Sequence, residues 1–482
     1  MNKSGSAPGR QGAIGSTPND AWLDQLNRRP AFFGALGLGI GIATGLAWWN
    51  AACFLLIAYL ARGKRSWIFA LVLFCVGLAI APRQKFDALK VNDYFQGQVT
   101  VVSMPRSTVD GYRFVALSGS SRYLVTTIDR YRISLGDELL IRGRREMLSE
   151  VSEQHWLDDA VVSQIRVRSS PMVISRGSIF WRWALEVRER VSAVFSRLLS
   201  PEDAALADSF LLNETTELDA ESMNRLAVSG VAHLIGSVGA KIYFMATCLF
   251  WLLSKVPLPR WTQTLLILAG LLLYTSACGM TANGMRAFCM CAIFMLCPLL
   301  RREFDAVSAL ACVFVGNILL WPRVIFDVGF QLSTICILGI ALFSSDINYW
   351  LSRHREKFEA PTVLKHAIVV SGICWLISSP LIAYHQYFVS LSVGLATLCA
   401  WIPFILLLGS SAVTLLLASI FPAGAKLIST SVMEPVIHGL RQIADILGSN
   451  TFFVPIAPFS AYWLLVIYVL ALFIWRPYYR SA

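Results

Sequence analysis

Long apolar runs that recur along the chain are the feature that most constrains its fold. They lie at about 31 to 48, 51 to 61, 67 to 81, 233 to 254, 263 to 279, 285 to 300, 306 to 321, 325 to 344, 366 to 384, 388 to 419 and 461 to 475. A helix needs roughly 20 apolar residues to cross a bilayer, and fewer where its neighbours compensate. Hydrophobic residues make up 56% of the 482 and charged residues only 15%, so lipid is expected to solvate much of the chain. We predict a mainly α polytopic membrane protein with about ten to twelve transmembrane helices.

Basic residues between the runs predict the orientation of the spans. These residues are Arg28, Arg29, Arg62, Lys64, Arg65, Lys255, Arg260, Arg301, Arg302 and the stretch from Arg353 to Lys357. All of them are cytoplasmic if the N-terminus is cytoplasmic and the runs alternate. Parity then favours two crossings in the run 388 to 419, because this also places Arg476 and Arg480 inside. Retention of these loops beside anionic lipid is the main explanation for the net charge of +11, and nucleic-acid affinity is the alternative.

The cysteines and histidines indicate no metal or redox chemistry. The 11 cysteines fall mostly inside apolar runs and form no CxxC pair, which is typical of small core residues. The six histidines include no HxHxD cluster. We therefore expect no metal site and no cofactor. We also expect no enzyme activity, because no nucleophile and base stand at a suitable spacing.

A polar insert after the third run has the pattern of a small β domain. Five alternating segments at 97 to 104, 112 to 118, 122 to 128, 138 to 143 and 161 to 168 are separated by turn residues. Five such strands suit a barrel of the OB type, and barrels of this type often bind single strands through basic and aromatic side chains. The candidates for such contacts are Arg106, Tyr112, Arg113, Tyr123, Arg130, Tyr131 and Arg132. An ordinary solvated β surface explains the same residues equally well.

The residues after the insert predict two consecutive helices. Residues 178 to 199 form an amphipathic pattern, with Ile179, Trp183 and other apolar residues on one side and arginines that include Arg188 towards the other. Such a helix commonly lies in the headgroup plane. Ser200, Pro201 and the two acids that follow them form a clear start for the next helix.

Polar residues inside the apolar runs are the candidates for function, because each one is costly in lipid unless it faces protein or water. They include Gly230, His233, Gly239, Lys241, Arg286, Asp327, Gln331, Ser333 and His385, with Pro380 ahead of the last of these. Asp327 and Gln331 are four residues apart and share a helix face. An ion pair between Arg286 and Asp327 is sterically feasible, and lining of a pore is the alternative use of these two residues.

Several of these segments resemble the competence domain of the ComEC family, through which bacteria draw transforming DNA across the inner membrane. The segments are GVAHLIGSVGA, NGMRAFCM, DVGFQLSTICILGI and SSPLIAYH, and LGDELLIRGR in the insert resembles a strand and turn of the OB-like domain in that family. The resemblance covers nearly all of the chain from about residue 30. Gly230, His233, Leu234, Gly239, Arg286, Asp327, Gly329, Phe330, Gln331, Leu332, Ser333, Pro380 and Leu381 match the family pattern.

Other positions depart from the family pattern. Val238 stands where the family usually has serine, Lys241 where it has a second histidine, Thr397 where asparagine is frequent, and Asn213 where it has glycine. Full-length family members also continue into a metallo-β-lactamase-like domain, whereas this sequence stops at Ala482. Hydrolysis of one strand is therefore expected from another polypeptide, or not at all.

The resemblance implies a multi-pass channel in the bacterial inner membrane that takes up single-stranded DNA during natural competence. It predicts a cytoplasmic tail at 1–29, N-terminal transmembrane helices at 30–82, an OB-like extracytoplasmic domain at 90–170, amphipathic and linker helices at 176–225, and the channel domain at 228–482. His233, Gly239, Lys241, Arg286, Asp327, Gln331 and Ser333 are the candidates for the DNA path. The implied partners are single-stranded DNA, the phospholipid bilayer, a separate nuclease, a DNA receptor, a cytoplasmic DNA motor and a further copy of the chain.

Two other classes of function remain open at this point. One is a nonconducting paralogue or membrane scaffold, which the changed motif residues favour. The other is a transporter of a different anionic polymer or of a lipid-linked precursor.

Overall fold

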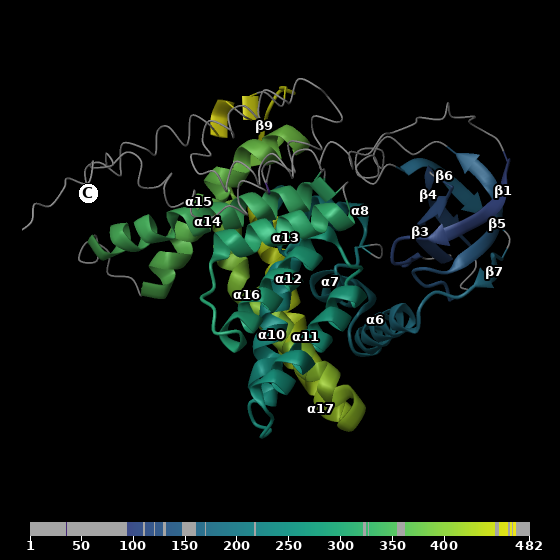
Figure 1. Cartoon of the computed structure of the whole chain (residues 1–482), viewed down its shortest axis with the longest axis horizontal. Helices are drawn as coiled ribbons and strands as arrows, with labels where there is room; N and C mark the ends of the chain where they lie inside the picture. Colours follow the sequence, from purple (N-terminus) through teal and green to yellow (C-terminus); the bar gives the residue numbers. More distant parts are fainter. Residues whose placement is uncertain are drawn as a thin grey trace, which may run out of the picture. The chain divides into compact units, whose positions relative to one another are not determined.

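A computed structural model gives the structure of the chain (Figure 1). It describes residues 35, 94–108, 111–119, 121–128, 132–146, 161–168, 170–215, 218–321, 324–325, 327–353, 362–448, 453–460, 463–464 and 466–468. The chain divides into two compact units, Met1–Ala81 with Phe459–Ala482, and Pro82–Pro458. The predicted tail, all but one residue of the N-terminal transmembrane region and most of the run 461 to 475 lie outside the described residues. The following account concerns the second unit.

The insert forms a closed five-stranded barrel with two short accessory strands. The strands are β1 (Tyr94–Val101), β2 (Arg106–Thr108), β3 (Gly111–Ser118), β4 (Ser121–Thr127), β5 (Glu138–Glu146), β6 (Val161–Val167) and β7 (Met172–Ser175). The order is β1-β3-β4-β6-β5, and antiparallel pairing of β1 with β5 closes the barrel. The pairing of β4 with β6 is parallel, which needs the Greek-key crossover of an OB-type barrel.

Alternation of apolar and polar residues builds the barrel interior. The buried positions include Val99 and Val101 on β1, Phe114 and Ala116 on β3, and Ile165 on β6, each two residues apart where they share a strand. The five predicted strands are confirmed, with their ends shifted by up to three residues. Strands β2 and β7 were missed because segments of three and four residues are too short to show a period.

The rest of the described chain is almost entirely helical (Figure 1). The helices are α6 (Ile179–Leu198), α7 (Pro201–Leu212), α8 (Ala220–Ser229), α9 (Ala232–Gly236), α10 (Val238–Leu253), α11 (Arg260–Ala277), α12 (Ala282–Leu299), α13 (Ala306–Leu320), α14 (Val328–Arg353), α15 (Thr362–Gln386), α16 (Val393–Ile420), α17 (Pro422–Ile428), the π-helix η4 (Ser429–Met433) and α18 (Glu434–Leu447). Strands β8 (Phe388–Ser390) and β9 (Phe453–Pro455) form a second, antiparallel sheet.

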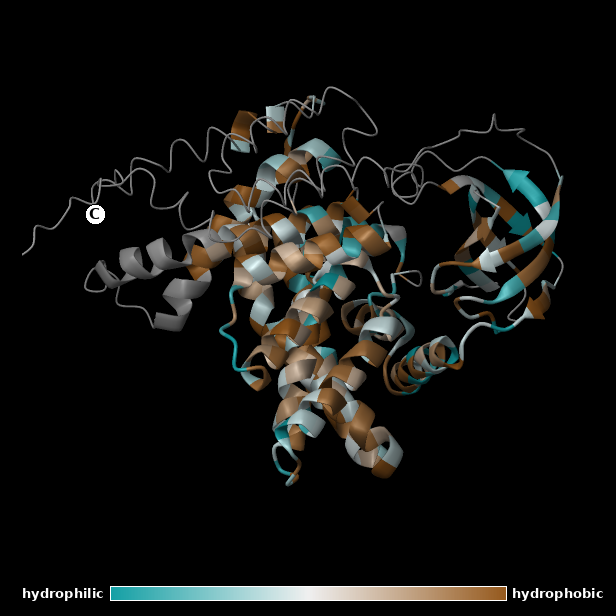
Figure 2. Cartoon of the chain, in the orientation of Figure 1, coloured by the Kyte–Doolittle hydropathy of each residue, from teal (hydrophilic) through white to brown (hydrophobic). Residues whose placement is uncertain are grey.

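Among the described residues, three helices are long and apolar enough to span a bilayer. They are α12, residues Ile368–Gln386 of α15, and α16, and shorter apolar helices cover Val238–Leu253, Ala306–Leu320 and Val328–Ala341. Hydrophobic colours dominate α10, α12 and α16 in Figure 2, whereas the barrel strands carry a mixture. Only 28% of the residues in the apolar window of α16 are buried and the others are partly or fully exposed, which suits a lipid environment.

The run 388 to 419 is one helix and not two crossings, which corrects the prediction. Helix α16 runs unbroken for 28 residues although Pro403 lies inside it. The chain then reverses through α17, η4 and α18, and Met433 packs beside Thr414 of α16. Strand β8 ends three residues before α16 begins, and β9 begins six residues after α18 ends. Because β8 and β9 pair with each other, the segment Pro422–Leu447, which we call the return segment, brings the chain back to the level where α16 began. The segment escaped the apolar search because α18 has a polar face.

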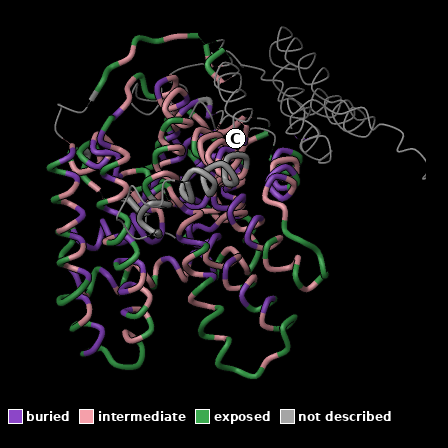
Figure 3. Tube along the Cα trace, turned by 90° about the vertical axis from the view of Figure 1, so that its left-hand side faces the viewer, coloured by how far each residue is buried: buried purple, intermediate pink, exposed green. Residues whose placement is uncertain are grey.

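A second correction concerns the faces of α6. Ala184, Leu185, Arg188 and Phe195 are its buried residues, whereas Ile179 and Trp183 are 59% and 57% exposed. The burial of Arg188 follows from its ion pair with Glu214, which lies just after α7. Helix α7 is buried on nearly all sides and packs with α16 and α18 into the largest apolar cluster of the described residues. Buried positions recur along the helices traced in Figure 3.

Candidate functional site

Lys241 is fully enclosed and serves to connect helices. It lies on α10 and is 1% exposed, and its Nζ donates to the carbonyl oxygen of Ile235 at 2.7 Å and to that of Ser209 at 3.5 Å. These carbonyls belong to α9 and α7, so the ammonium group satisfies backbone acceptors at a helix break. In this conformation Lys241 lies away from the surface of the described residues, and its role on a DNA path stays a prediction.

Arg286 is buried in the bundle with one part of its guanidinium unsatisfied. On α12, it is 3% exposed; Nε donates to Ser333 Oγ at 3.0 Å and Nη2 donates to Asn283 Oδ1 at 2.9 Å. Its Nη1 is buried without a hydrogen-bond partner. Gly239 lies against this group, since a Cβ added there would meet Arg286 Nη2 at 4.0 Å. A buried cationic donor with capacity left over is suited to an anion.

Asp327 and Gln331 have separate uses. The Asp327 carboxylate accepts from the backbone N–H of Phe330 at 2.6 Å and so caps α14, while the Arg286 guanidinium hydrogen-bonds to Ser333 and Asn283 instead of to Asp327. The predicted possibility of an ion pair between Arg286 and Asp327 is thus replaced by hydrogen bonds from Arg286 to two neutral side chains. Gln331 donates to the Ile325 carbonyl at 2.7 Å and accepts from His385 Nε2 at 3.0 Å, which links α14 to α15.

His233 is the exposed member of the predicted path. Its Nδ1 donates to the Gly230 carbonyl, and its Nε2 lies 3.4 Å from Thr397 Oγ1 at the start of α16. Asn283 in turn donates to the Gly236 carbonyl at 3.1 Å. The family-like segments thus converge where α9, α12, α14, α15 and α16 begin or end. We call His233, Asn283, Arg286, Gln331, Ser333 and His385 the polar cluster.

The barrel residues divide into accessible and inaccessible ones. Arg113 is exposed on β3 opposite Arg106 of β2, and Arg132 is exposed and pairs with Glu189 of α6 at 3.3 Å. Tyr123 is 8% exposed in the barrel core with Arg145 over its ring, so the prediction of a stacking surface there is wrong. Its burial follows from the alternation of β4, which turns it inward. Arg130 and Tyr131 lie outside the described residues.

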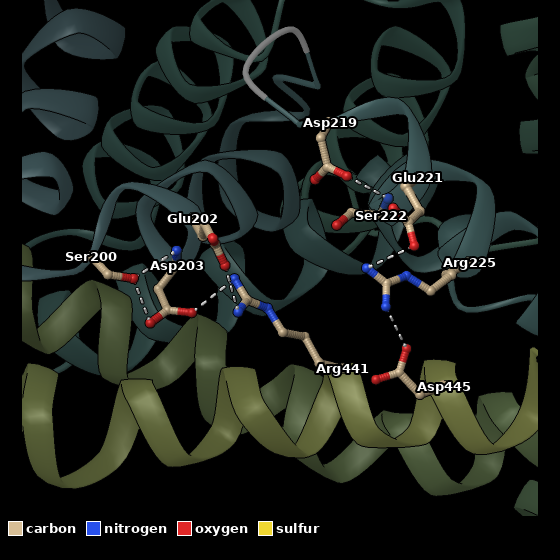
Figure 4. Close-up of polar contacts among 9 residues, drawn as sticks. All are labelled: Ser200, Glu202, Asp203, Asp219, Glu221, Ser222, Arg225, Arg441 and Asp445. Carbon is tan, nitrogen blue, oxygen red and sulfur yellow. Dashed lines mark hydrogen bonds and ion pairs between the residues drawn. The ribbon is translucent and has the colours of Figure 1, made fainter.

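The sequence reasoning missed a set of ion pairs along the return segment (Figure 4). Arg441 of α18 pairs with Glu202 at 3.3 Å and with Asp203 at 3.0 Å, both in the first turn of α7. One turn further along α18, Asp445 pairs with Arg225 of α8 at 3.4 Å. The predicted cap is confirmed, because Ser200 Oγ accepts from the backbone N–H of Asp203. The helical period of the apolar residues at 433, 437, 440, 444 and 447 could have revealed α18.

Replacement of Gly230 with alanine is expected to destabilise the chain by about 1–3 kcal/mol. The backbone φ is 85° there, and an added Cβ would meet Val393 Cγ2 at 2.5 Å and Cα at 3.0 Å. Thermal unfolding of the purified protein in detergent measures the effect. Gly236→Ala is the control, because an added Cβ there meets nothing within 4 Å. Equal melting temperatures for the two variants would contradict the assigned packing.

The family follows from a match over the same helices that hold the polar cluster. The family model described as "Competence protein" matches residues 210–479, which is more than half of the chain. The chain belongs to the competence protein family. A relative, "ComE operon protein 3" of Bacillus subtilis (strain 168), is 24% identical over 201 residues. That match covers 42% of this chain and 25% of the relative, so it spans a quarter of the relative's length.

No solved structure matches the chain. Within the described ranges, no group of three or more histidine, cysteine or acidic residues has the arrangement of a metal site. The sequence resemblance to the ComEC family is thus confirmed by the family match and by the distant relative, while the roles of individual residues stay predictions.

Proposed function

We propose that this chain is a multi-pass protein of the bacterial inner membrane that passes single-stranded DNA into the cytoplasm during natural transformation. The observation that carries the proposal is Arg286, a buried arginine with a spare N–H donor, placed in the part of the chain that matches the competence family. An arginine inside an apolar bundle is costly and marks a functional site by default. Its removal should therefore affect transport more than folding.

A single strand carries one phosphate per nucleotide and needs a hydrated, positively biased path across about 30 Å of hydrocarbon. In the proposed function, the strand reaches the bundle beside the barrel, and the polar cluster receives it. The N-terminus is cytoplasmic and the barrel extracytoplasmic. A separate nuclease, a receptor and a cytoplasmic motor supply steps for which this chain has no assigned group, and the chain itself is not an enzyme.

A nonconducting membrane scaffold is the second candidate, and the enclosure of Lys241 favours it. Its ammonium group has been absorbed into helix packing, so it contributes no charge to a surface. Transport of another anionic polymer is distinguished from both by ligand binding, since it requires affinity for that polymer and none for single-stranded DNA at moderate salt.

Deletion of the gene in the native host is expected to leave transforming DNA outside the inner membrane. Labelled duplex DNA is supplied to competent cells, and nuclease-resistant label is measured separately in the periplasm and the cytoplasm. We expect cytoplasmic label to fall at least about a hundredfold, because a bare bilayer does not pass a polyanion. Plasmid-borne wild-type protein serves as the control. Unchanged cytoplasmic label in the deletion strain would refute the proposal.

A further inference from the structure

A pocket of about 430 Å³ lies between the barrel and α6. Arg132, Ser134 and Arg176 line it from the barrel and the segment after β7, and Ile179, Arg182, Trp183, Leu185, Glu186 and Glu189 line it from α6. The volume falls in the range of small-molecule sites. The pocket is half open between its two walls, so a single unit of a flexible chain can enter it, whereas the flat surface of a bilayer cannot.

Three guanidinium groups from separate parts of the chain meet in this pocket. Arg132 pairs with Glu189 yet its side chain is 74% exposed, and Arg176 is 41% exposed. Arg182 forms no ion pair with any residue that the structure describes. The second carboxylate of the lining, Glu186, is already paired with Arg190 at 2.7 Å. The lining therefore keeps an excess of positive charge, which favours an anion.

The barrel wall of the pocket is fixed by one buried carboxylate. Asp137 is 0% exposed and accepts from the backbone N–H of Ser134 at 2.9 Å and from that of Gly177 at 2.7 Å. It also pairs with Arg176, whose Nη1 donates to the Arg132 carbonyl at 2.8 Å. These bonds fix the guanidinium of Arg176 and the backbone of Arg132 before a ligand arrives, which lowers the entropic cost of binding.

The helix wall adds an aromatic surface and a favourable dipole. Trp183 is 57% exposed, and its indole offers a face on which a planar base can stack. The first turn of α6 contains no acidic residue, and Ser178 forms no side-chain cap, so the N-terminal N–H groups of this 20-residue helix keep their partial positive charge. An anionic group beside a planar apolar group matches this combination.

We propose that the pocket between the barrel and α6 binds one nucleotide of a single DNA strand, with its phosphate on Arg182 and Arg132 and its base on Trp183. The inference rests on the proposed function and names the place where the strand first contacts the chain. It assigns recognition to the junction of the two walls and not to the outer face of the barrel sheet.

The test uses the full chain in nanodiscs of phosphatidylcholine and a fluorescein-labelled oligo(dT) of about 15 nucleotides. Anisotropy gives Kd at several salt concentrations. Arg182→Gln is expected to weaken binding about fivefold and to reduce the slope of log affinity against log salt by about 0.7, because one phosphate contact is lost. Trp183→Leu is expected to weaken binding about tenfold with an unchanged slope, because stacking involves no counterion.

Matched controls lie on the same chain. Arg197→Gln removes the same charge from the exposed last turn of α6, outside the pocket, and Trp251→Leu removes a similarly exposed indole from α10. Both controls should bind like wild type. The proposal would be overturned if Arg182→Gln and Trp183→Leu bound oligo(dT) with the affinity and salt slope of wild type. It would also be overturned if the control variants lost as much affinity as the pocket variants.

Two further arms separate the sources of failure. Nanodiscs that contain phosphatidylglycerol test whether the pocket binds an anionic lipid headgroup instead. If this lipid lowers the affinity of the wild-type chain for oligo(dT) to that of the Arg182→Gln variant, the pocket is a headgroup site and the proposal is overturned. Uptake of labelled DNA by cells is measured in parallel. If the pocket variants bind oligo(dT) normally while the deletion strain loses uptake, only the assignment of nucleotide binding to the pocket is refuted. If the deletion strain takes up DNA normally, the proposed function is refuted.

Discussion

Glu214→Gln is expected to lower the free energy of unfolding by about 3 kcal/mol or more, the range for one broken buried ion pair. Glu214 and Arg188 pair with side chains only 10% and 9% exposed, at the junction of α6 and α7. Burial, more than the nearby Arg106, lowers the pKa of Arg188 to about 10, so the guanidinium remains charged at neutral pH. The substitution therefore leaves a buried cation with too little compensation.

The measurement is SDS-induced unfolding of the purified chain in mixed micelles. Glu186→Gln is the matched control, because the Glu186 to Arg190 pair is an exposed i,i+4 contact on the same helix, worth about 0.5 kcal/mol or less. The double variant Glu214→Gln with Arg188→Gln should recover part of the loss, since no charge then remains buried. Equal free energies of unfolding for Glu214→Gln and Glu186→Gln would show that the pair between Arg188 and Glu214 does not stabilise the fold.

Arg286→Met is expected to reduce transformation at least about a hundredfold while the protein is at least as stable as wild type. The methionine fills similar space, and a buried guanidinium with an unsatisfied Nη1 costs free energy that the substitution removes. The loss of function has another reason, because the phosphate of a passing strand loses its charged donor. Transformation frequency and the amount of protein in membranes are measured together.

Arg286→Lys and Lys241→Met complete this experiment. Lysine keeps the charge without the guanidinium geometry, so we expect roughly a tenth of wild-type transformation. Lys241→Met is expected to lower protein stability, because the Ile235 and Ser209 carbonyls lose their donor. If Arg286→Met loses transformation only in proportion to its abundance, Arg286 is a packing residue and the central support for transport is gone.

Local patterns were enough to predict much of the architecture. Alternation over six to eight residues placed β1, β3, β4, β5 and β6, and Ser200 with Pro201 marked the start of α7. Apolar runs placed α10 to α16. Each of these depends on the period of a single segment or on one cap, so no distant partner is needed to predict it.

The candidate site was only partly predictable. The motif segments led to Arg286 and Ser333, which do lie in contact, 3.0 Å apart. Residue type alone gave no means of distinguishing Arg286, which keeps a spare donor, from Lys241, whose ammonium group is occupied by two carbonyls. That difference depends on the place of α7, which begins some 40 residues earlier in the chain, and no local pattern encodes it.

The sequence by itself determined the class of the protein, its helical bundle with an inserted barrel, and its family, because hydropathy and short motifs are properties of single segments. Tertiary structure alone decided three matters: that α18 returns along α16, that Arg188 is buried while Trp183 is exposed, and that three arginines share a pocket with an indole. Each of these requires segments far apart in the chain to pack together. Packing selects which face of an amphipathic helix is covered, and the period shows only that the helix has two faces.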